Sequence, residues 1–244
     1  MSTNNYDDFC IVVAKQIQDQ LNKKANSHIA LPAGHSPCGY YNILAQASQS
    51  NEIDWRQAQC FALDDYIGAQ EEHSFQYFLE SHLYRFTNLP VNARFNPRNC
   101  DNYDQLIQDR GGIDLCVLGL GVNGHIAFNE PPTTNSSYTH CVFLTNSTRE
   151  ANKDEFVPAN SVNLSNTIGS GNDSAYLDAV PNKAVTMGIA TIMASKRIIL
   201  AVSGKHKKEI LIRTLKNPAN AQCPASYLTS HSDLLVVTDF EFAI

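Results

Sequence analysis

Short apolar runs alternate with amphipathic stretches along most of the chain. The runs are rich in Val, Ile and Leu, and several of them end at Gly, Ser or Asp, which is typical of strands buried on both faces of a parallel sheet. Runs at 92–97 and 140–144 are further strand candidates. We predict the principal buried strands at residues 28–33, 59–63, 113–118, 197–202 and 234–237.

Between these runs, apolar residues recur at the spacing of a helix. In the stretch 75–86 the positions on one face follow i, i+3, i+4, i+7, i+8 and i+11, which predicts a strongly amphipathic helix. Further helices are predicted at about 9–21, 40–47, 101–108 and 206–215, with a short one from Pro224. This alternation predicts one domain over residues 1–244, a three-layer αβα doubly wound fold with a mostly parallel, Rossmann-like sheet.

The segment 157–182 departs from this alternation. Asn, Ser, Gly and Pro dominate it, and its apolar periodicity is faint. It is longer than most connections inside a compact domain, where such a segment is usually functional or poorly ordered. We therefore expect a long loop or lid at about 157–182.

Polar side chains gather directly after the strand predicted at 113–118. The glycines at 119, 121 and 124 let the backbone turn sharply and approach a ligand closely. Asn123, His125, Asn129 and Glu130 follow within a few residues, before Pro131. In open α/β sheets the ligand crevice lies beyond the carboxyl ends of the strands, so this cluster is the leading candidate for a site.

Three other strand ends carry residues that have either a structural or a functional role. The turn at 34–37, between a strand and a helix, can bind an anion with its backbone amides, although Gly, Ser and Pro are common in any turn. Asp64 and Asp65 follow the strand at 59–63 and are either cap or turn residues or catalytic acids. Lys205 follows the strand at 197–202 and is either a solvated charge or an anion ligand.

Composition narrows the class of protein and of partner. The 244 residues carry a net charge of −6 and show no basic run, which argues against a nucleic-acid partner and leaves any anion site to local groups. The apolar runs are too short to cross a bilayer, and residues 1–20 lack a signal-peptide pattern, so we expect a cytoplasmic protein without a membrane partner. The seven scattered cysteines show no Cys-x-x-Cys spacing and suggest neither a disulfide framework nor a zinc site.

The run at 119–131 resembles the signature of the glucosamine-6-phosphate deaminases and the related galactosamine-6-phosphate deaminases (isomerases); it reads GLGVNGHIAFNEP. The wider superfamily includes 6-phosphogluconolactonases, which are similar through Gly-His and then diverge, whereas FNEP follows the deaminase pattern. The resemblance extends more weakly over residues 28–239 and also fits a family helix at 184–193. It implies a deaminase that converts a sugar phosphate, with glucosamine 6-phosphate favoured over galactosamine 6-phosphate, to the ketohexose 6-phosphate and ammonia.

This chemistry needs two proton transfers and neither a metal nor a redox cofactor. Ring opening requires a base that takes the proton of the C1 hydroxyl and returns it to O5, and His125 suits this task because imidazole titrates near neutrality. Glu130 is expected to orient the ring of His125, and Asp64 to move the proton from C2. The resemblance implies the same roles. Asn123 can only hydrogen-bond and position its neighbours, because an amide is no base at neutral pH.

For the phosphate, the resemblance implies contacts from the turn that contains Gly34, His35 and Ser36, and from Lys205. Many deaminases also use an arginine within an Arg-Phe-Phe sequence, but the matching residues here, 153–156, read KDEF. Either Lys153 substitutes for that arginine, or Arg149 and the long loop supply the charge.

Two alternatives to a deaminase stay open. A sugar-lactone phosphate hydrolase of the 6-phosphogluconolactonase type is disfavoured by Asn129 and Glu130. A non-catalytic regulator that binds a sugar phosphate on the same fold would have no need of Asp64, His125 and Glu130 together. The sequence leaves open whether the protein is a monomer or a homo-oligomer.

Overall fold

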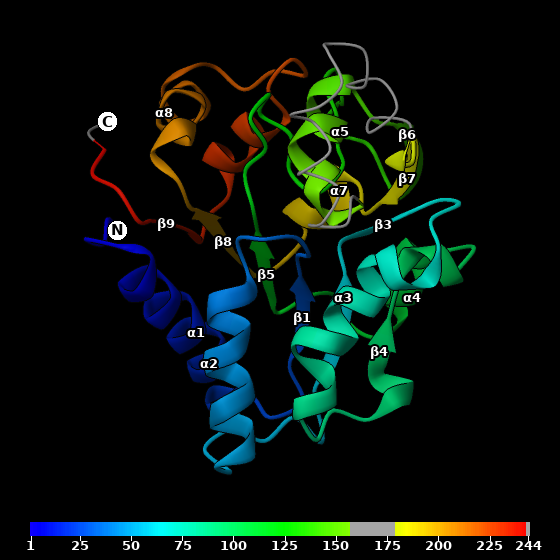
Figure 1. The fold of residues 1–244 in the computed structure, drawn as a ribbon, viewed down its shortest axis with the longest axis vertical. Helices are drawn as coiled ribbons and strands as arrows, with labels where there is room; N and C mark the ends of the chain where they lie inside the picture. The colour runs from blue at the N-terminus through cyan, green and yellow to red at the C-terminus, as the bar shows by residue number, and fades with distance from the viewer. Residues whose placement is uncertain (157–178, 243–244) are drawn as a thin grey trace, which may run out of the picture.

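A six-stranded parallel sheet forms the middle layer of the computed structural model, which describes residues 1–156 and 179–242 (Figure 1). All five strand pairs in this sheet are parallel. The order across the sheet is β4 (Arg94–Phe95), β2 (Gln59–Ala62), β1 (His28–Leu31), β5 (Leu115–Leu118), β8 (Arg197–Val202) and β9 (Leu234–Thr238). The predicted fold class and its principal strands are thereby confirmed.

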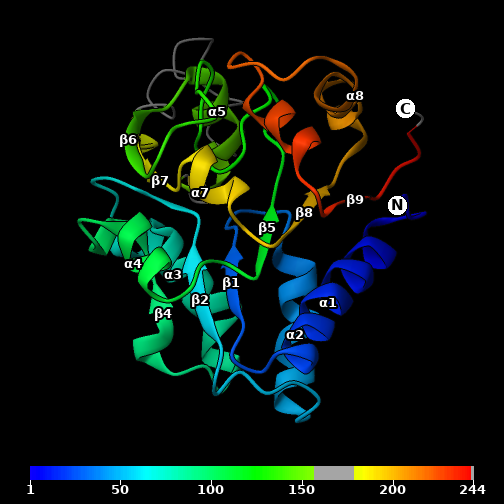
Figure 2. The same ribbon diagram turned by 180° about the vertical axis from the view of Figure 1, so that it is seen from behind.

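Helices cover both faces of the sheet (Figures 1 and 2). Successive strand residues point to opposite faces, so Ile29 and Leu31 of β1 join one core cluster and Ala30 joins the other. The first cluster includes residues of α1 (Tyr6–Lys23), α2 (Cys38–Gln49) and α3 (Phe75–His82). The second includes residues of α4 (Tyr103–Asp109), α7 (Ile189–Met193) and α8 (Lys208–Lys216).

A small antiparallel sheet that the sequence did not predict lies beside the main one. Its strand order is β3-β7-β6, with β3 at Asp64–Tyr66, β7 at Lys183–Thr186 and β6 at His140–Phe143. The helix expected at 184–193 is therefore wrong in its first half. Val185 pairs with Asp65 on one side and Cys141 on the other, so partners distant in sequence decide its conformation.

One predicted helix is shorter than expected. The helix predicted at 75–86 ends at His82, and a 3₁₀ turn at Tyr84–Phe86 follows. Most of the expected lid, residues 157–178, lies outside the described residues. The other elements are α5 (Asn146–Asn152) and short 3₁₀ turns at Glu71–His73, Val91–Ala93, Pro97–Asn99, Lys153–Glu155, Lys205–Lys207 and Pro224–Ser230. Within the described ranges, no helix is long and apolar enough to cross a membrane.

The strand order creates a topological switch point. The chain moves outward from β1 through β2 to β4, and it moves outward in the opposite direction from β5 through β8 to β9. β1 and β5 are therefore neighbours whose following loops diverge to opposite sides. In open α/β sheets the ligand crevice forms at the carboxyl ends of such a strand pair.

Candidate active site

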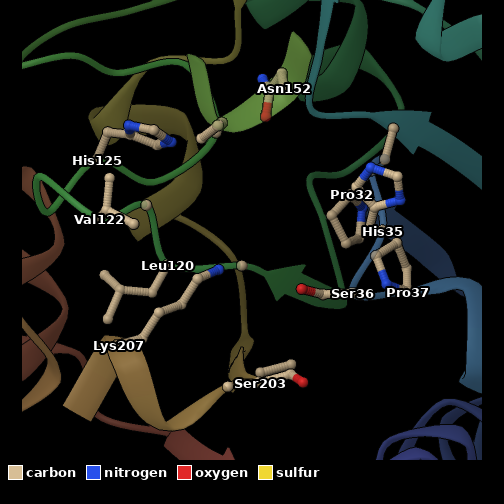
Figure 3. Close-up of a pocket in the computed structure, with 18 of the residues that line it drawn as sticks. Pro32, His35, Ser36, Pro37, Leu120, Val122, His125, Asn152, Ser203 and Lys207 are labelled. Carbon is tan, nitrogen blue, oxygen red and sulfur yellow. The ribbon is translucent and has the colours of Figure 1, made fainter. Parts of the chain in front are cut away.

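A cavity of about 520 Å³ lies at this switch point. Most of the residues that line it follow four of the parallel strands, and Figure 3 shows many of them around the open space. They include the turn after β1, Asp64 after β2, the glycine-rich loop after β5 and the basic turn after β8. The structure thus brings together polar groups that are more than a hundred residues apart in the sequence.

The loop after β5 holds His125 by close approach of backbone and ring. A Cβ atom on Gly121 would lie 2.3 Å from both Cε1 and Nε2 of the His125 ring, so only glycine leaves room for the ring. Gly124 has φ of 90°, a backbone conformation that favours glycine. The backbone N–H of His125 donates to Oδ1 of Asn123 at 3.1 Å. The glycines therefore place the imidazole in the cavity wall.

Behind this wall, Glu130 is buried, with its side chain 4% exposed. Asn123 donates from Nδ2 to Oε2 of Glu130 at 2.6 Å. Thr145 donates to the same carboxylate from its backbone N–H at 3.4 Å, and its hydroxyl oxygen lies 3.3 Å from this carboxylate. Hydrogen-bond donors thus offset part of the cost of burying this charge.

The contact between His125 and Glu130 is not a direct hydrogen bond. Nδ1 of His125 lies 3.8 Å from Oε2 of Glu130, which is beyond hydrogen-bonding distance. The nearer group is the hydroxyl of Thr148, 3.3 Å from Nδ1. Neither Thr145 nor Thr148 was among the site residues predicted from the sequence; their only signal was their place directly after the strand predicted at 140–144.

Burial sets the protonation of His125. It lowers the pKa of the ring below the usual histidine value, because the cationic form loses solvation. The negative charge of Glu130 opposes this shift, whereas the positive charge of Lys207 adds to it. The net direction keeps the imidazole neutral, which is the form that can accept a proton.

The two adjacent acids on β3 have separate environments. Asp64 lines the cavity, whereas Asp65 is fully buried away from it. Because side chains alternate along a strand, neighbouring residues must point to opposite sides. The carboxylate of Asp65 accepts hydrogen bonds from four groups, namely the backbone N–H groups of Tyr66, Phe75 and Gln76 and Nδ2 of Asn96. Asp65 therefore holds the start of α3, and Asp64 is the acid that the cavity presents.

The turn after β1 forms another wall of the cavity through Gly34, His35 and Ser36. Gly34 has φ of 100°, and α2 begins shortly after the turn. The hydroxyl of Tyr6 holds the turn in place: it donates to the carbonyl of Ser36 at 3.0 Å and accepts from the N–H of Gly39 at 3.1 Å. The structure therefore places this turn in the cavity wall, where the sequence predicted it.

The lysine in the cavity is Lys207, and the sequence-based choice of Lys205 is wrong in this respect. Among the described residues, Lys205 is exposed and not part of the lining, whereas Lys207 and His206 line the cavity. Figure 3 shows the Lys207 side chain reaching in from the side opposite the turn that holds His35 and Ser36. The cause is local: Gly204, with φ of 96°, reverses the chain into a 3₁₀ turn that exposes its first residue and directs its third inward.

Neither Arg149 nor Lys153 lines the cavity in the described part of the chain. Arg149 donates from Nε and a terminal nitrogen to the carbonyl of Val180, at 3.2 and 3.0 Å. Lys153 is exposed. Besides His125, the basic side chains of the described lining are His35, His206 and Lys207. In the same ranges, no group of three or more His, Cys, Asp or Glu residues is placed to hold a metal ion.

A family model and individual relatives assign the chain to the same family. A family model described as glucosamine-6-phosphate isomerases/6-phosphogluconolactonase matches residues 3–154. A glucosamine-6-phosphate deaminase from Thermoanaerobacter sp. (strain X514) is 34% identical and aligns over 99% of this chain and 92% of its own length. The protein of that name from Lachnoclostridium phytofermentans is 36% identical, with 99% of each chain covered.

Solved structures agree with this result. A monomeric glucosamine-6-phosphate deaminase superposes with a TM-score of 0.85 at 31% identity, covering 98% of this chain and 95% of that one. A 6-phosphogluconolactonase from Trypanosoma brucei has a TM-score of 0.69 at 16% identity, with 98% and 94% covered, and this likeness shows the fold alone.

Proposed function

The chain belongs to the family of glucosamine-6-phosphate isomerases and 6-phosphogluconolactonases, and from this premise we propose that it is a glucosamine-6-phosphate deaminase. The reaction converts the aminosugar phosphate and water to the ketohexose 6-phosphate and ammonia. One observation carries the proposal: Asp64, His125 and Lys207 line the same cavity. The reaction needs two proton-transfer groups near C1 and C2 of the sugar and an anion site for the phosphate on C6. Asp64 and His125 can supply the first, and Lys207 can contribute to the second.

His125 is the proposed group for ring opening. Its lowered pKa keeps the imidazole neutral, so the ring can take the proton of the C1 hydroxyl and return it to O5. Glu130 stabilises the transient cation through its charge, 3.8 Å from Nδ1. Asn123, which donates to Glu130, holds this carboxylate in place.

Asp64 is the proposed group for isomerisation. After ring opening, its carboxylate takes the proton from C2 and delivers it to C1, and a proton of the amino group passes to O1. This leaves a hydroxyl at C1 and an imine at C2. Water then adds to C2, and ammonia departs. Two observations support this role. Asp64 lies on the cavity wall, whereas the carboxylate of its neighbour Asp65 accepts hydrogen bonds that hold the start of α3.

The phosphate is proposed to bind at the other end of the cavity. The turn with Gly34, His35 and Ser36 offers backbone and side-chain donors, and Lys207 offers a charge from the facing wall. This arrangement supplies local positive charge in a protein of net charge −6. The family arginine is absent, and neither Arg149 nor Lys153 takes its place in the proposal.

A direct assay separates the proposed activity from its alternatives. Ammonia release is measured with glucosamine 6-phosphate, galactosamine 6-phosphate and 6-phosphogluconolactone. We expect ammonia from glucosamine 6-phosphate, with the galacto epimer slower or inactive. Hydrolysis of the lactone without ammonia from either aminosugar would point to the lactonase branch, and binding without turnover would point to a regulator.

Lys207→Ala is expected to raise KM roughly 10- to 150-fold, because a hydrogen bond to a charged group contributes about 1.5–3 kcal/mol. The matched control is Lys205→Ala, two residues away and exposed, for which we expect a change of no more than about 2-fold. Steady-state kinetics of the two variants decide the point. An unchanged KM for Lys207→Ala would place the phosphate elsewhere.

The pH dependence of kcat/KM should report the environment of His125. Burial lowers the pKa of this ring, so the neutral base persists at lower pH, and we expect the acid limb below the usual histidine value of about 6.5. Glu130→Gln removes the charge that raises this pKa, so the limb should move to still lower pH. Profiles of the wild type and this variant test the sign. A limb that moves upward would contradict it.

We propose that residues 1–244 form a single catalytic domain. Its first residues lie against β9: the amine of Met1 donates to the carbonyl of Val236 at 2.7 Å, and Ser2 forms a bridge with Thr238. The core clusters also combine residues from the first helix with residues of the last strand.

A further inference from the structure

The hydroxyl groups of two threonines lie beside the contact between His125 and Glu130. The Oγ1 atom of Thr148 lies 3.3 Å from Nδ1 of His125. The Thr145 hydroxyl donates to Thr148 Oγ1 at 3.1 Å, and it also lies 3.3 Å from both carboxylate oxygens of Glu130. A line of short contacts therefore joins the ring to the carboxylate, although the direct distance is too long for a hydrogen bond.

Local structure holds Thr148 rigidly. The residue is 1% exposed and belongs to the first turn of α5. Thr145 is the N-cap of this helix, and its Oγ1 accepts the backbone N–H of Thr148 at 3.3 Å. The position of the Thr148 hydroxyl is thus set by the helix start rather than by rotation of a surface side chain.

The opposite edge of the ring lies against Gly121. A Cβ atom on Gly121 would lie 2.3 Å from Nε2 and Cε1 of His125, and both residues line the cavity. A neutral imidazole carries one proton, on either Nδ1 or Nε2. Only the form with the proton on Nδ1 leaves Nε2 free to accept a proton from a bound substrate.

We propose that Thr148 is a positioning residue that selects this tautomer: Nδ1–H donates to its Oγ1, and Nε2 stays unprotonated at the cavity. The oxygen has two lone pairs, so it can accept from the ring and from Thr145 at once. The carboxylate of Glu130, 3.8 Å from Nδ1, adds a negative potential that favours a proton on the same nitrogen. The catalytic consequence rests on the proposed deaminase function, but the tautomer does not.

NMR spectroscopy distinguishes the two tautomers of His125 directly. Long-range ¹H–¹⁵N NMR spectra of protein labelled in its histidine nitrogens are recorded without substrate, and His125→Gln identifies the signals of His125. We expect the Nδ1–H form in the wild type and in Thr148→Ser, and loss of this preference in Thr148→Val. Thr148→Ala provides the same test if the valine variant does not fold.

The matched control is Thr191→Val, which removes another buried threonine hydroxyl, one that donates to Asp104. It should leave the His125 signals unchanged. A wild-type ring protonated on Nε2, or an unchanged tautomer in both hydroxyl-free variants of Thr148, would overturn the proposal.

Kinetics of the same variants test the consequence for catalysis. Thr148→Val should lower kcat roughly 10- to 100-fold with little change in KM, because the ring becomes a cation when it takes the C1 hydroxyl proton and a hydrogen bond to a charged group is then lost. Thr148→Ser should restore most of the rate. Equal kcat for the wild type and Thr148→Val would overturn the catalytic role. If the wild type releases no ammonia while the tautomer results hold, the deaminase function fails and the role of Thr148 in setting the tautomer stands.

Discussion

Asp64→Asn is expected to lower turnover of glucosamine 6-phosphate by roughly 10²–10⁴-fold, the usual contribution of a positioned acid–base group. The amide keeps the size of the carboxylate, but it cannot take the C2 proton. Exchange of that proton with solvent should therefore stop, whereas KM, which reflects contacts at the phosphate end of the cavity, should change little. The measurements are steady-state kinetics and loss of the C2 proton signal in heavy water.

Asp65→Asn is the control that separates chemistry from folding. The carboxylate of Asp65 accepts four hydrogen bonds at the start of α3, and an amide would present an N–H group to at least one of those donors. We expect a loss of about 1–3 kcal/mol in the free energy of unfolding, with C2 exchange retained in the folded fraction. Exchange at the wild-type rate in Asp64→Asn would remove Asp64 from the mechanism.

His125→Gln is expected to slow turnover of the ring-closed substrate by roughly 10²–10⁴-fold. Glutamine can hydrogen-bond to the C1 hydroxyl but cannot carry its proton to O5. An open-chain analogue of the substrate bypasses this step, so its isomerisation should suffer much less. The ratio of the two losses, rather than either loss alone, identifies the step in which the ring acts.

The matched control is His82→Gln, at an exposed histidine that stacks on Phe78 in α3. Both substrates should be converted at the wild-type rate by this variant. If His125→Gln reduces the rates on both substrates equally, the residue acts after ring opening, or only holds the cavity wall. Equal losses would therefore contradict a role of His125 in ring opening.

Much of the fold follows from short stretches of sequence. A buried parallel strand needs a continuous apolar run because helices cover both faces of its sheet, and β1, β2, β5, β8 and β9 carry such runs. The polar loop after β5 is likewise readable, since a strand end followed by glycines and an imidazole is one local unit. Because parallel strands end at the same edge, the sequence also determined that Gly34, Asp64 and His125 would meet.

Tertiary contacts decided the features that the sequence left undetermined. Residues 184–186 are a strand because β3 and β6 pair with them on both sides. Their own residue types do not determine this conformation. The inward position of Lys207, rather than Lys205, follows from the turn after Gly204. Thr148 reaches His125 only because the start of α5 lies against the loop after β5. Local patterns determine which face of a strand is apolar, but the packing of distant segments determines which polar atoms come within hydrogen-bonding distance.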